Sequence, residues 1–255
     1  ARPLAITDCL NFGSPEREDI YYQLKESIRG LARACRVLGV PVISGNVSLY
    51  NETLGQAIYP TPVVGMVGLV EDIDRVCTMG FRSGGDIVLL LGGSPGPGSV
   101  DGLAGSEYME MAHGLVVGRP DIDLGLEKRL QRLCLRAIRR GLIRSAHDCS
   151  DGGLAVTLAE SSIAGGIGFR GEEGVVGERI DSSLFGEKPS RIVVSVVPGD
   201  VARLGEMAVK AKVSMRWLGA VGGDRFFVPG CVDLALEELD KAWRGGLRRE
   251  LGQAK

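Results

Sequence analysis

The sequence predicts an α/β protein, with an α+β arrangement as the alternative, divided into two domains. Short apolar runs typical of strands alternate along the chain with segments whose apolar residues recur every three or four positions, as in amphipathic helices. A chain of 255 residues can form one large or two smaller domains. The periodicity lapses between Met79 and Gly85, so we expect a first domain over residues 1–82 and a second over residues 83–255.

The first domain is expected to contain one long helix and three strands. Pro3–Thr7 is a largely apolar run that predicts a strand, and Glu18–Leu38 carries its apolar residues on one helical face. A second strand is expected within Val42–Tyr50 and a third over Pro62–Val70. This order of strand, helix, strand and strand is typical of an α/β unit.

The second domain is expected to alternate between strands and helices. Asp86–Leu91 is almost entirely apolar, which is typical of a strand covered on both faces. Gly92–Gly105 holds six glycines and two prolines, which favours a lid or a ligand-binding loop over a tight turn. The remaining expected elements are helices over Glu107–His113, Leu124–Arg140, Gly153–Ala164, Val201–Lys212 and Asp233–Leu251, and strands up to Ala146, over Arg191–Val197 and over Arg216–Val221.

Composition excludes several classes of function. Thirty Lys and Arg against 32 Asp and Glu give a net charge of −2, so the chain as a whole is not drawn to nucleic acid or to anionic membranes. The six cysteines are scattered without the spacing of a zinc site or a disulfide framework, and no apolar run approaches the roughly 20 residues of a transmembrane helix. We therefore expect a cytoplasmic protein. Because the chain opens without Met, directly into its first strand, we also expect it to be a fragment of a longer polypeptide.

Three polar motifs could carry chemistry. In Gly45–Glu52, Gly45 allows a ligand close to the backbone, and strand alternation places Asn46 and Ser48 on one face, although Asn and Gly also close ordinary hairpins. Thr7–Gly13 follows the first strand, where α/β folds place ligands, but an Asp there also caps helices. His147–Ala155 combines two carboxylates with a glycine-rich helix start suited to an anion, and N-capping explains it equally well.

Other polar features are better explained by packing. The helix over Leu124–Arg140 bears six basic residues, but its apolar set (Leu126, Leu130, Leu133, Ala137 and Ile138) predicts a core-facing helix with a solvated basic side rather than a nucleic-acid site. The basic residues of the last helix are interpreted in the same way. Cys9 and Cys149 lack a signature of activation and are expected to pack.

Taken together, these motifs resemble a known family. Ala5–Gly13, Gly45–Glu52, Pro60–Gly65 and His147–Ala155 are similar, in this order, to the C-terminal half of the synthetase subunit of phosphoribosylformylglycinamidine synthase, over nearly the whole chain. The resemblance implies the two-domain architecture of the aminoimidazole-ribonucleotide-synthetase-like superfamily, with an N-terminal half-barrel-forming domain and a C-terminal α/β domain.

The resemblance also assigns residues. It implies that Asp8 and Gly45 bind ATP, that Asn46 binds Mg²⁺ and that Ser48 contacts the substrate. The family's catalytic histidines lie in the other half of the subunit, so no residue of this chain is expected to be catalytic and the chain alone is expected to be inactive.

The activity so implied is a ligase reaction of purine biosynthesis. Formylglycinamide ribonucleotide, ATP and ammonia from glutamine give formylglycinamidine ribonucleotide, ADP and phosphate through an iminophosphate. The implied partners are the N-terminal half of the same subunit, a glutaminase subunit and a small accessory subunit, with a homodimer as an alternative; neither nucleic acid nor a membrane is expected.

By the family's internal pseudo-symmetry, Asp148, Asp151 and Glu187, with the Gly102–Glu107 loop, are a hypothetical auxiliary site for a structural ADP or ATP with Mg²⁺. Two other functions stay open: a small-molecule kinase of the same superfamily, and a nucleotide-stabilised scaffold without chemistry of its own.

Overall fold

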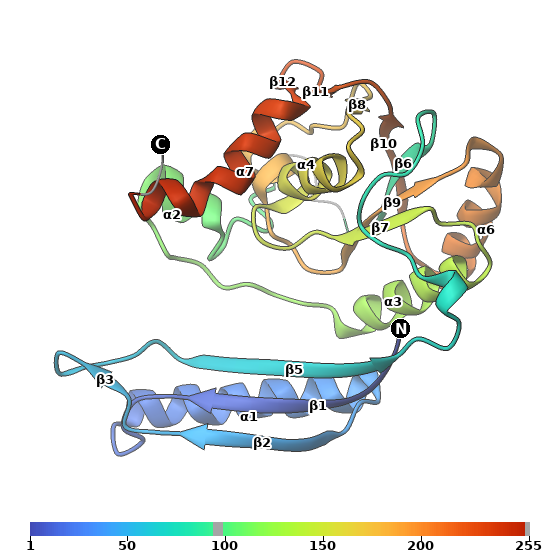
Figure 1. Cartoon of the computed structure of the whole chain (residues 1–255). Coiled ribbons are helices and arrows are strands. Elements are labelled where there is room, and N and C mark those ends of the chain that lie inside the picture. The colour runs from blue at the N-terminus through green and yellow to red at the C-terminus, as the bar shows by residue number, and fades with distance from the viewer. Residues whose placement is uncertain (94–98, 253–255) are drawn as a thin grey trace. The chain divides into compact units, whose positions relative to one another are not determined.

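The chain divides into two compact units, Ala1–Asp74 and Arg75–Lys255. A computed structural model describes residues 1–93 and 99–252 (Figure 1). The observed boundary, between Asp74 and Arg75, lies earlier in the chain than the predicted boundary after residue 82, because residues 75–82 pack with the second unit. Phe81 is buried in that unit's core and its N–H donates to the Ser161 carbonyl at 3.0 Å, and Arg75 Nη1 donates to the Arg139 carbonyl at 2.9 Å.

The first unit is a three-stranded sheet with one helix along it (Figure 1). The strand order is β2-β1-β5, with β1 parallel to β2 and antiparallel to β5. Its elements are β1 Arg2–Asn11, α1 Glu18–Leu38, β2 Val42–Ser48, β5 Thr61–Leu69 and a small hairpin of β3 Glu52–Thr53 and β4 Gln56–Ala57. The predicted helix and all three predicted strands are confirmed, and the first strand runs four residues further than expected because β1 pairs with both neighbours up to Asn11.

One face of this sheet is buried and the other is open. Leu10 and Phe12 form a small core with Ile20 of α1, so α1 covers the face to which these side chains point. On the opposite face Val63 and Val67 of β5 remain 54% and 61% exposed, and no other helix belongs to this unit among its described residues. The open face is an apolar surface that the unit does not bury by itself.

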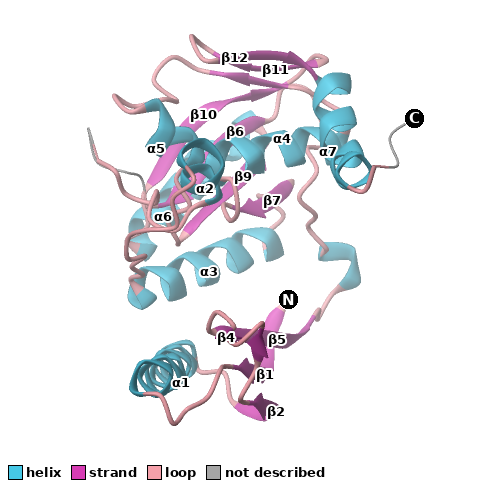
Figure 2. Cartoon of the chain, turned by 90° about the vertical axis from the view of Figure 1, so that its left-hand side faces the viewer, coloured by secondary structure: helices cyan, strands magenta, loops and turns pink. Residues whose placement is uncertain are grey.

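The second unit is built on a seven-stranded sheet in the order β12-β11-β8-β10-β6-β9-β7, and Figure 2 labels all of these strands except β8. Its strands are β6 Ile87–Gly92, β7 Ser145–Asp148, β8 Phe169–Gly171, β9 Arg191–Val196, β10 Met215–Val221, β11 Arg225–Val228 and β12 Val232–Ala235. Its helices are α2 Glu107–His113, α3 Leu124–Arg139, α4 Gly153–Gly165, α5 Ile180–Phe185, α6 Val201–Ala211 and α7 Leu236–Glu250. Single 3-10 turns lie at Ile73–Arg75, across the division, and at Pro198–Asp200.

Strand β6 lies at the centre of two cores. Val88 and Leu90 pack on one side with Leu154 of α4, whereas Leu89 packs on the other side with Leu130 of α3 and with α6. Every residue of β6 is buried, which confirms the prediction of a strand covered on both faces. The prediction for α3 is also confirmed, because its apolar side joins the second core and its arginines point outward.

The sequence misplaced or missed some short elements. The last helix begins at Leu236 rather than Asp233, because Asp233 pairs with Phe227 in the β11–β12 ladder. The elements β8, α5, β11 and the β3–β4 hairpin were not anticipated. The predicted loop Gly92–Gly105 includes residues 94–98, which lie outside the described residues. None of the described helices is long and apolar enough to cross a lipid bilayer.

Candidate functional site

The parallel pairing of β1 with β2 brings the first two motifs side by side. Asp8 lies opposite Gly45, Cys9 opposite Asn46, and Asn11 opposite Ser48. Residues that are 37 positions apart in the sequence therefore become direct neighbours at one end of the sheet. This register gives a structural basis for treating the two motifs as one site.

Gly45 is required by its contact with Asp8. A Cβ atom at position 45 would lie 2.2 Å from Asp8 Oδ1 and 2.3 Å from the Asp8 carbonyl oxygen, well inside van der Waals contact. The Asp8 side chain is half-buried, and the structure describes no hydrogen bond or ion pair of its carboxylate within residues 1–93 and 99–252. A carboxylate without a protein partner, against a bare stretch of backbone, is available to a ligand.

The four site residues predicted in the first unit form two pairs on opposite faces. Since side chains alternate along a strand, Asp8 shares the α1 face with Leu10, and Gly45 lies on the same side. Asn46 and Ser48 project to the open face, as their opposite neighbours in β1 do. The prediction that Asn46 and Ser48 share a face is confirmed, but the structure does not gather all four residues into a single cluster.

A polar network holds the open-face pair in place. Cys9 Sγ donates to Asn46 Oδ1 at 2.8 Å, and Asn11 Nδ2 donates to the Thr61 carbonyl at 3.2 Å. Ser48 Oγ lies 3.2 Å from Asn51 Oδ1, and Asn51 Nδ2 donates to the Phe12 carbonyl at 3.1 Å. Sequence reasoning assigned Cys9 to packing, whereas its thiol orients the Asn46 amide.

The donor set limits how a metal ion could bind. Within the part of the chain that the structure describes, no group of three or more His, Cys, Asp or Glu side chains is placed to hold an ion. Mg²⁺ prefers hard oxygen ligands and is often held by one or two protein oxygens together with substrate phosphates. The amide oxygen of Asn46 fits such a site only if a nucleotide supplies the remaining ligands.

In the second unit, Glu187 joins three segments. Its Oε1 accepts from the Glu107 N–H at 3.0 Å and from the Gly152 N–H at 2.8 Å, and its own N–H donates to the Gly102 carbonyl at 2.7 Å. The carboxylate therefore occupies the position that an anion would take at the start of α4. Of the predicted auxiliary residues, Glu187 is the one held most firmly.

The other two auxiliary residues are more exposed. Asp148 is 75% exposed and lies 3.6 Å from His147 Nδ1, while His147 Nε2 lies 2.9 Å from Glu160 Oε2. Asp151 is also exposed, in the turn before α4. The structure thus places Asp148 and Asp151 at the rim of the α4 start without bonding them to Glu187.

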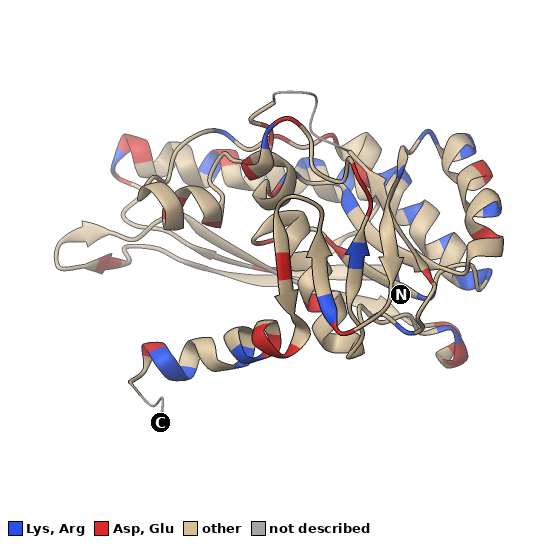
Figure 3. Cartoon of the chain, turned by 90° about the horizontal axis from the view of Figure 1, so that it is seen from above, with Lys and Arg blue, Asp and Glu red and all other residues tan. Residues whose placement is uncertain are grey.

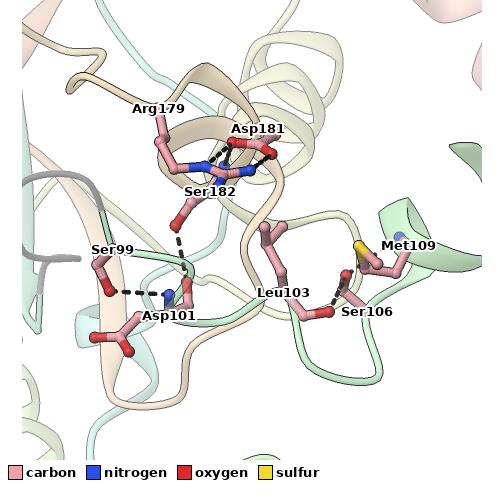
Figure 4. Close-up of polar contacts among 8 residues, drawn as sticks. All are labelled: Ser99, Asp101, Leu103, Ser106, Met109, Arg179, Asp181 and Ser182. Atoms are coloured by element: carbon pink, nitrogen blue, oxygen red, sulfur yellow. Dashed lines mark hydrogen bonds and ion pairs between the residues drawn. The ribbon is translucent and has the colours of Figure 1, made fainter. Parts of the chain in front are cut away.

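The loop before α2 is anchored to α5, as Figure 4 shows, and also to the turn that follows α5. The Asp101 carbonyl accepts from Ser182 Oγ at 3.0 Å, and the Asp101 N–H donates to Ser99 Oγ at 3.0 Å. Lys188 Nζ lies 2.7 Å from Asp101 Oδ2, and this hydrogen bond lowers the pKa of the Asp101 carboxyl. Residues 99–107 are therefore fixed against the segment that carries Glu187.

A buried arginine supports this segment and was missed by sequence reasoning. Arg191 is 2% exposed, its Nε donates to the Lys188 carbonyl at 2.9 Å and its Nη2 donates to the Gly186 carbonyl. Burial lowers the pKa of its guanidinium. Burial also raises the pKa of the nearby Cys149 thiol, which agrees with the packing role expected for Cys149.

Comparison with protein families matches both units. The family "AIR synthase related protein, C-terminal domain" matches residues 83–229, and "AIR synthase related protein, N-terminal domain" matches residues 1–70.

Curated relatives extend over almost all of the chain. A phosphoribosylformylglycinamidine synthase subunit PurL from Thermomicrobium roseum is 51% identical over 97% of this chain and 33% of its own length. The protein of the same name from Anaeromyxobacter dehalogenans is 48% identical over 99% of this chain and 34% of its own. The chain therefore spans about a third of the length of these relatives.

Solved structures agree in fold. Thermotoga maritima PurL complexed with FGAR covers 94% of this chain and 40% of its own, with a TM-score of 0.71 and 21% identity. Escherichia coli HypE, a hydrogenase maturation protein, covers 92% and 73%, with a TM-score of 0.64 and 16% identity. At these identities the likeness concerns the fold.

Proposed function

The chain belongs to the AIR synthase related family, and on that premise we propose that it is the C-terminal part of an ATP-dependent amidoligase of purine biosynthesis. The reaction joins ammonia from glutamine to formylglycinamide ribonucleotide and gives formylglycinamidine ribonucleotide, ADP and phosphate. The observation that carries the proposal is the β1–β2 register, which sets Asp8 against Gly45 and Asn46 beside Cys9. The relatives named as synthase subunits at about half identity support it.

Each residue of the first-unit site has a role that its chemistry can perform. Gly45 keeps the backbone open beside the Asp8 carboxylate, and together they contact ATP where it passes around the edge of β2, an outer strand of this sheet, so that its phosphates reach the open face. On the open face, the Asn46 amide oxygen contributes to a Mg²⁺ site completed by phosphate oxygens, and the Ser48 hydroxyl binds the substrate. When bound, the ion neutralises the phosphates and aligns the transfer.

The chemical step transfers a phosphoryl group and then displaces it. The carbonyl oxygen of the glycinamide group attacks the γ-phosphorus of ATP, the bond to ADP breaks, and an iminophosphate forms. Ammonia then adds to the amide carbon of that group, and the former amide oxygen leaves as part of inorganic phosphate. This chain binds and orients the reactants, and the groups that move protons belong to the other part of the subunit.

The open face of the first unit supports a need for partners. Val63 and Val67 remain exposed beside the polar residues of the site, so a covering element would bury apolar area and close the site together. The N-terminal half of the same subunit is the proposed cover, and a second copy of this chain is the alternative. A glutaminase subunit and a small accessory subunit complete the proposed assembly, in line with a solved neighbour described as PurLQS from Thermotoga maritima.

We propose the auxiliary nucleotide site as a separate feature of the second unit. Glu187 already satisfies the Gly152 and Glu107 N–H groups, so a phosphate that uses them must displace its carboxylate. Glu187→Gln weakens that competing anion and should tighten binding of Mg·ADP, whereas Asp148→Asn should weaken it if Asp148 holds the ion. If neither the unaltered chain nor either variant binds Mg·ADP at millimolar concentration, a nucleotide site beside Glu187 is excluded.

The proposed function is tested in a chimera. The chain replaces the corresponding third of the Thermomicrobium roseum relative, and formation of formylglycinamidine ribonucleotide is measured with ATP and ammonium. We expect activity with the unaltered chain and a loss of at least about tenfold in kcat with Asn46→Ala, since its oxygen would no longer reach the ion. Ser44→Ala, one alternation earlier on the same face, is the matched control and should stay near the unaltered rate.

The outcomes separate three functions. A folded chimera with no ATP-dependent product, or one in which Asn46→Ala and Ser44→Ala behave alike, would contradict the assignment of this site. Phosphorylation of a small acid without incorporation of ammonia would favour the kinase alternative. Activity that survives every substitution at Asp8, Asn46 and Ser48 would leave this chain a scaffold.

A further inference from the structure

A groove between α3 and α6 gathers positive charge in a way that the proposed function does not use. Its volume is about 620 Å³, and its walls are lined by Arg129, Arg132, Arg136, Arg140, Lys210 and Lys212, with Leu133 and Met207 among its apolar contacts. All six basic residues are exposed, and none of the described residues that line the groove is acidic. In a chain of net charge −2, six cations around one cavity form a local concentration of positive charge.

The helical pitch explains how α3 makes one wall. At about 100° per residue, Arg129, Arg136 and Arg140 lie within about 40° of one another around the helix axis, and Arg132 is the next along. This stripe borders the buried side of α3, which begins at Leu133. Glu127 lies on the far side of the helix and accepts from Gln131 Nε2 at 2.7 Å, so it does not neutralise the groove.

The second wall points its lysines into the same space. Lys212 follows α6 with a left-handed backbone, at φ 55° and ψ 47°, a conformation that glycine adopts with least strain. Arg140 Nη1 contacts Met207 Sδ at 3.6 Å, which links the two helices across the groove. Within residues 1–93 and 99–252, Arg132, Arg136, Lys210 and Lys212 have no ion-pair partner, so their charges are available to a ligand.

We propose that this groove is a binding site for a compact polyphosphate anion, such as inorganic triphosphate or the triphosphate group of a nucleotide. The volume lies in the range of small-molecule sites, and cations on two facing walls match a ligand with several negative charges close together. Arginine guanidinium groups suit phosphate oxygens because they donate in pairs. Like charges at helical spacing disfavour α3 when the groove is empty, so a bound polyanion relieves a repulsion that is already present.

A small anion fits the groove better than a nucleic acid does. Among residues 1–93 and 99–252, no aromatic side chain lines the groove to stack on a base, and the cations converge on one cavity rather than follow an extended surface. Elsewhere in the chain basic and acidic residues are interspersed, as along α7, the helix that leads to the C label in Figure 3. The site also differs from the candidate nucleotide site around Glu187, to which none of its lining residues belongs.

The test uses calorimetric titration of the full 255-residue chain with sodium triphosphate, in buffer containing EDTA to exclude Mg²⁺. Saturable binding of one equivalent is expected. The double variant R132Q/R136Q should weaken it at least about tenfold, because two charge-assisted contacts are lost. The control R244Q/R248Q removes the same net charge from α7 and should change the dissociation constant less than about twofold. Thermal unfolding of each variant verifies that the exposed substitutions leave the fold intact.

Further arms identify the ligand. If R132Q/R136Q weakens the binding of ATP in EDTA and Glu187→Gln leaves that binding unchanged, the groove is a site for a nucleotide triphosphate. If R132Q/R136Q weakens the binding of triphosphate but not that of ATP, the groove is a site for free polyphosphate. The proposal is overturned if triphosphate fails to bind at about 5 mM, if both double variants weaken it equally, or if a single-stranded RNA oligonucleotide binds saturably where triphosphate does not.

Discussion

Replacing Gly45 by alanine tests the central contact of the candidate site. The new methyl carbon would lie 2.2 Å from Asp8 Oδ1 and 2.3 Å from the Asp8 carbonyl oxygen. A side-chain oxygen can rotate away, but a backbone carbonyl in the middle of a three-stranded sheet moves only if β1 or β2 moves. We therefore expect Gly45→Ala to disturb the pairing of these strands and to displace the Asp8 carboxylate.

The size of the effect follows from overpacking. An added carbon in a filled space costs about 1–3 kcal/mol of stability, and the backbone contact here places the expected loss in the upper part of that range. Gly30→Ala is a matched control in the same unit, because position 30 is within α1 and no atom lies within 4 Å of the added Cβ. This substitution should raise the free energy of unfolding by up to about 1 kcal/mol, since alanine favours the helix more than glycine does.

The two units need separate readouts. Trp217 and Trp243 both belong to the second unit, so tryptophan fluorescence during urea unfolding reports that unit and should not change. Hydrogen exchange of peptides spanning residues 2–11 and 42–48 reports the first unit. Faster exchange in Gly45→Ala, with unchanged or slower exchange in Gly30→Ala, is expected. Equal protection of these peptides in Gly45→Ala and in the unaltered chain would refute the close contact and the argument that only glycine fits.

Two further predictions concern the second unit. Glu187→Ala leaves two backbone N–H groups without their charged acceptor, so the unfolding free energy of the second unit, followed by tryptophan fluorescence, should fall by about 2 kcal/mol or more. The control Glu173→Ala, at an exposed position, should change this free energy by less than about 0.5 kcal/mol. Equal effects of the two substitutions would contradict the role of Glu187. Burial raises the pKa of Asp86 despite Arg144 at 3.8 Å, so the folded chain binds this proton more tightly than the unfolded chain and ionisation of Asp86 costs stability. Asp86→Asn should therefore raise the free energy of unfolding most at pH values above the folded pKa of Asp86. This gain should shrink as the pH falls toward the unfolded pKa near 3.8, and a gain that grows on acidification would contradict this sign.

Long periodic elements were predictable because their pattern repeats several times. Glu18–Leu38, with 21 residues, was predicted with the bounds that the structure gives. The shorter helix Glu107–His113 was also predicted with its observed bounds, and the continuous apolar run of β6 identified it as buried on both sides. Short strands offer no such repeat: β12 spans only Val232–Ala235 and was absorbed into the helix that follows it. Sheet order could not be deduced at all, since it depends on long-range pairing.

The candidate site was predictable as a set of residues but not as an arrangement. Strand alternation gave the common face of Asn46 and Ser48, whereas only the parallel register shows that Asp8 lies against Gly45. The same register turns Cys9 from a packing residue into the donor that orients Asn46. The apolar sequence around Arg191 gave no sign that its guanidinium would be buried beneath Glu187's segment.

The most direct test of the proposed ligase reaction follows the carbonyl oxygen of the glycinamide group. In the chimera that carries this chain, substrate labelled with ¹⁸O at the glycinamide carbonyl is turned over with ATP and ammonium, and the inorganic phosphate is analysed by mass spectrometry. Phosphoryl transfer to that oxygen predicts one ¹⁸O in each phosphate formed, with the yield reduced in parallel by Asn46→Ala. Unlabelled phosphate formed at the same rate as product would mean that ATP is cleaved without activating the amide, and would contradict the account.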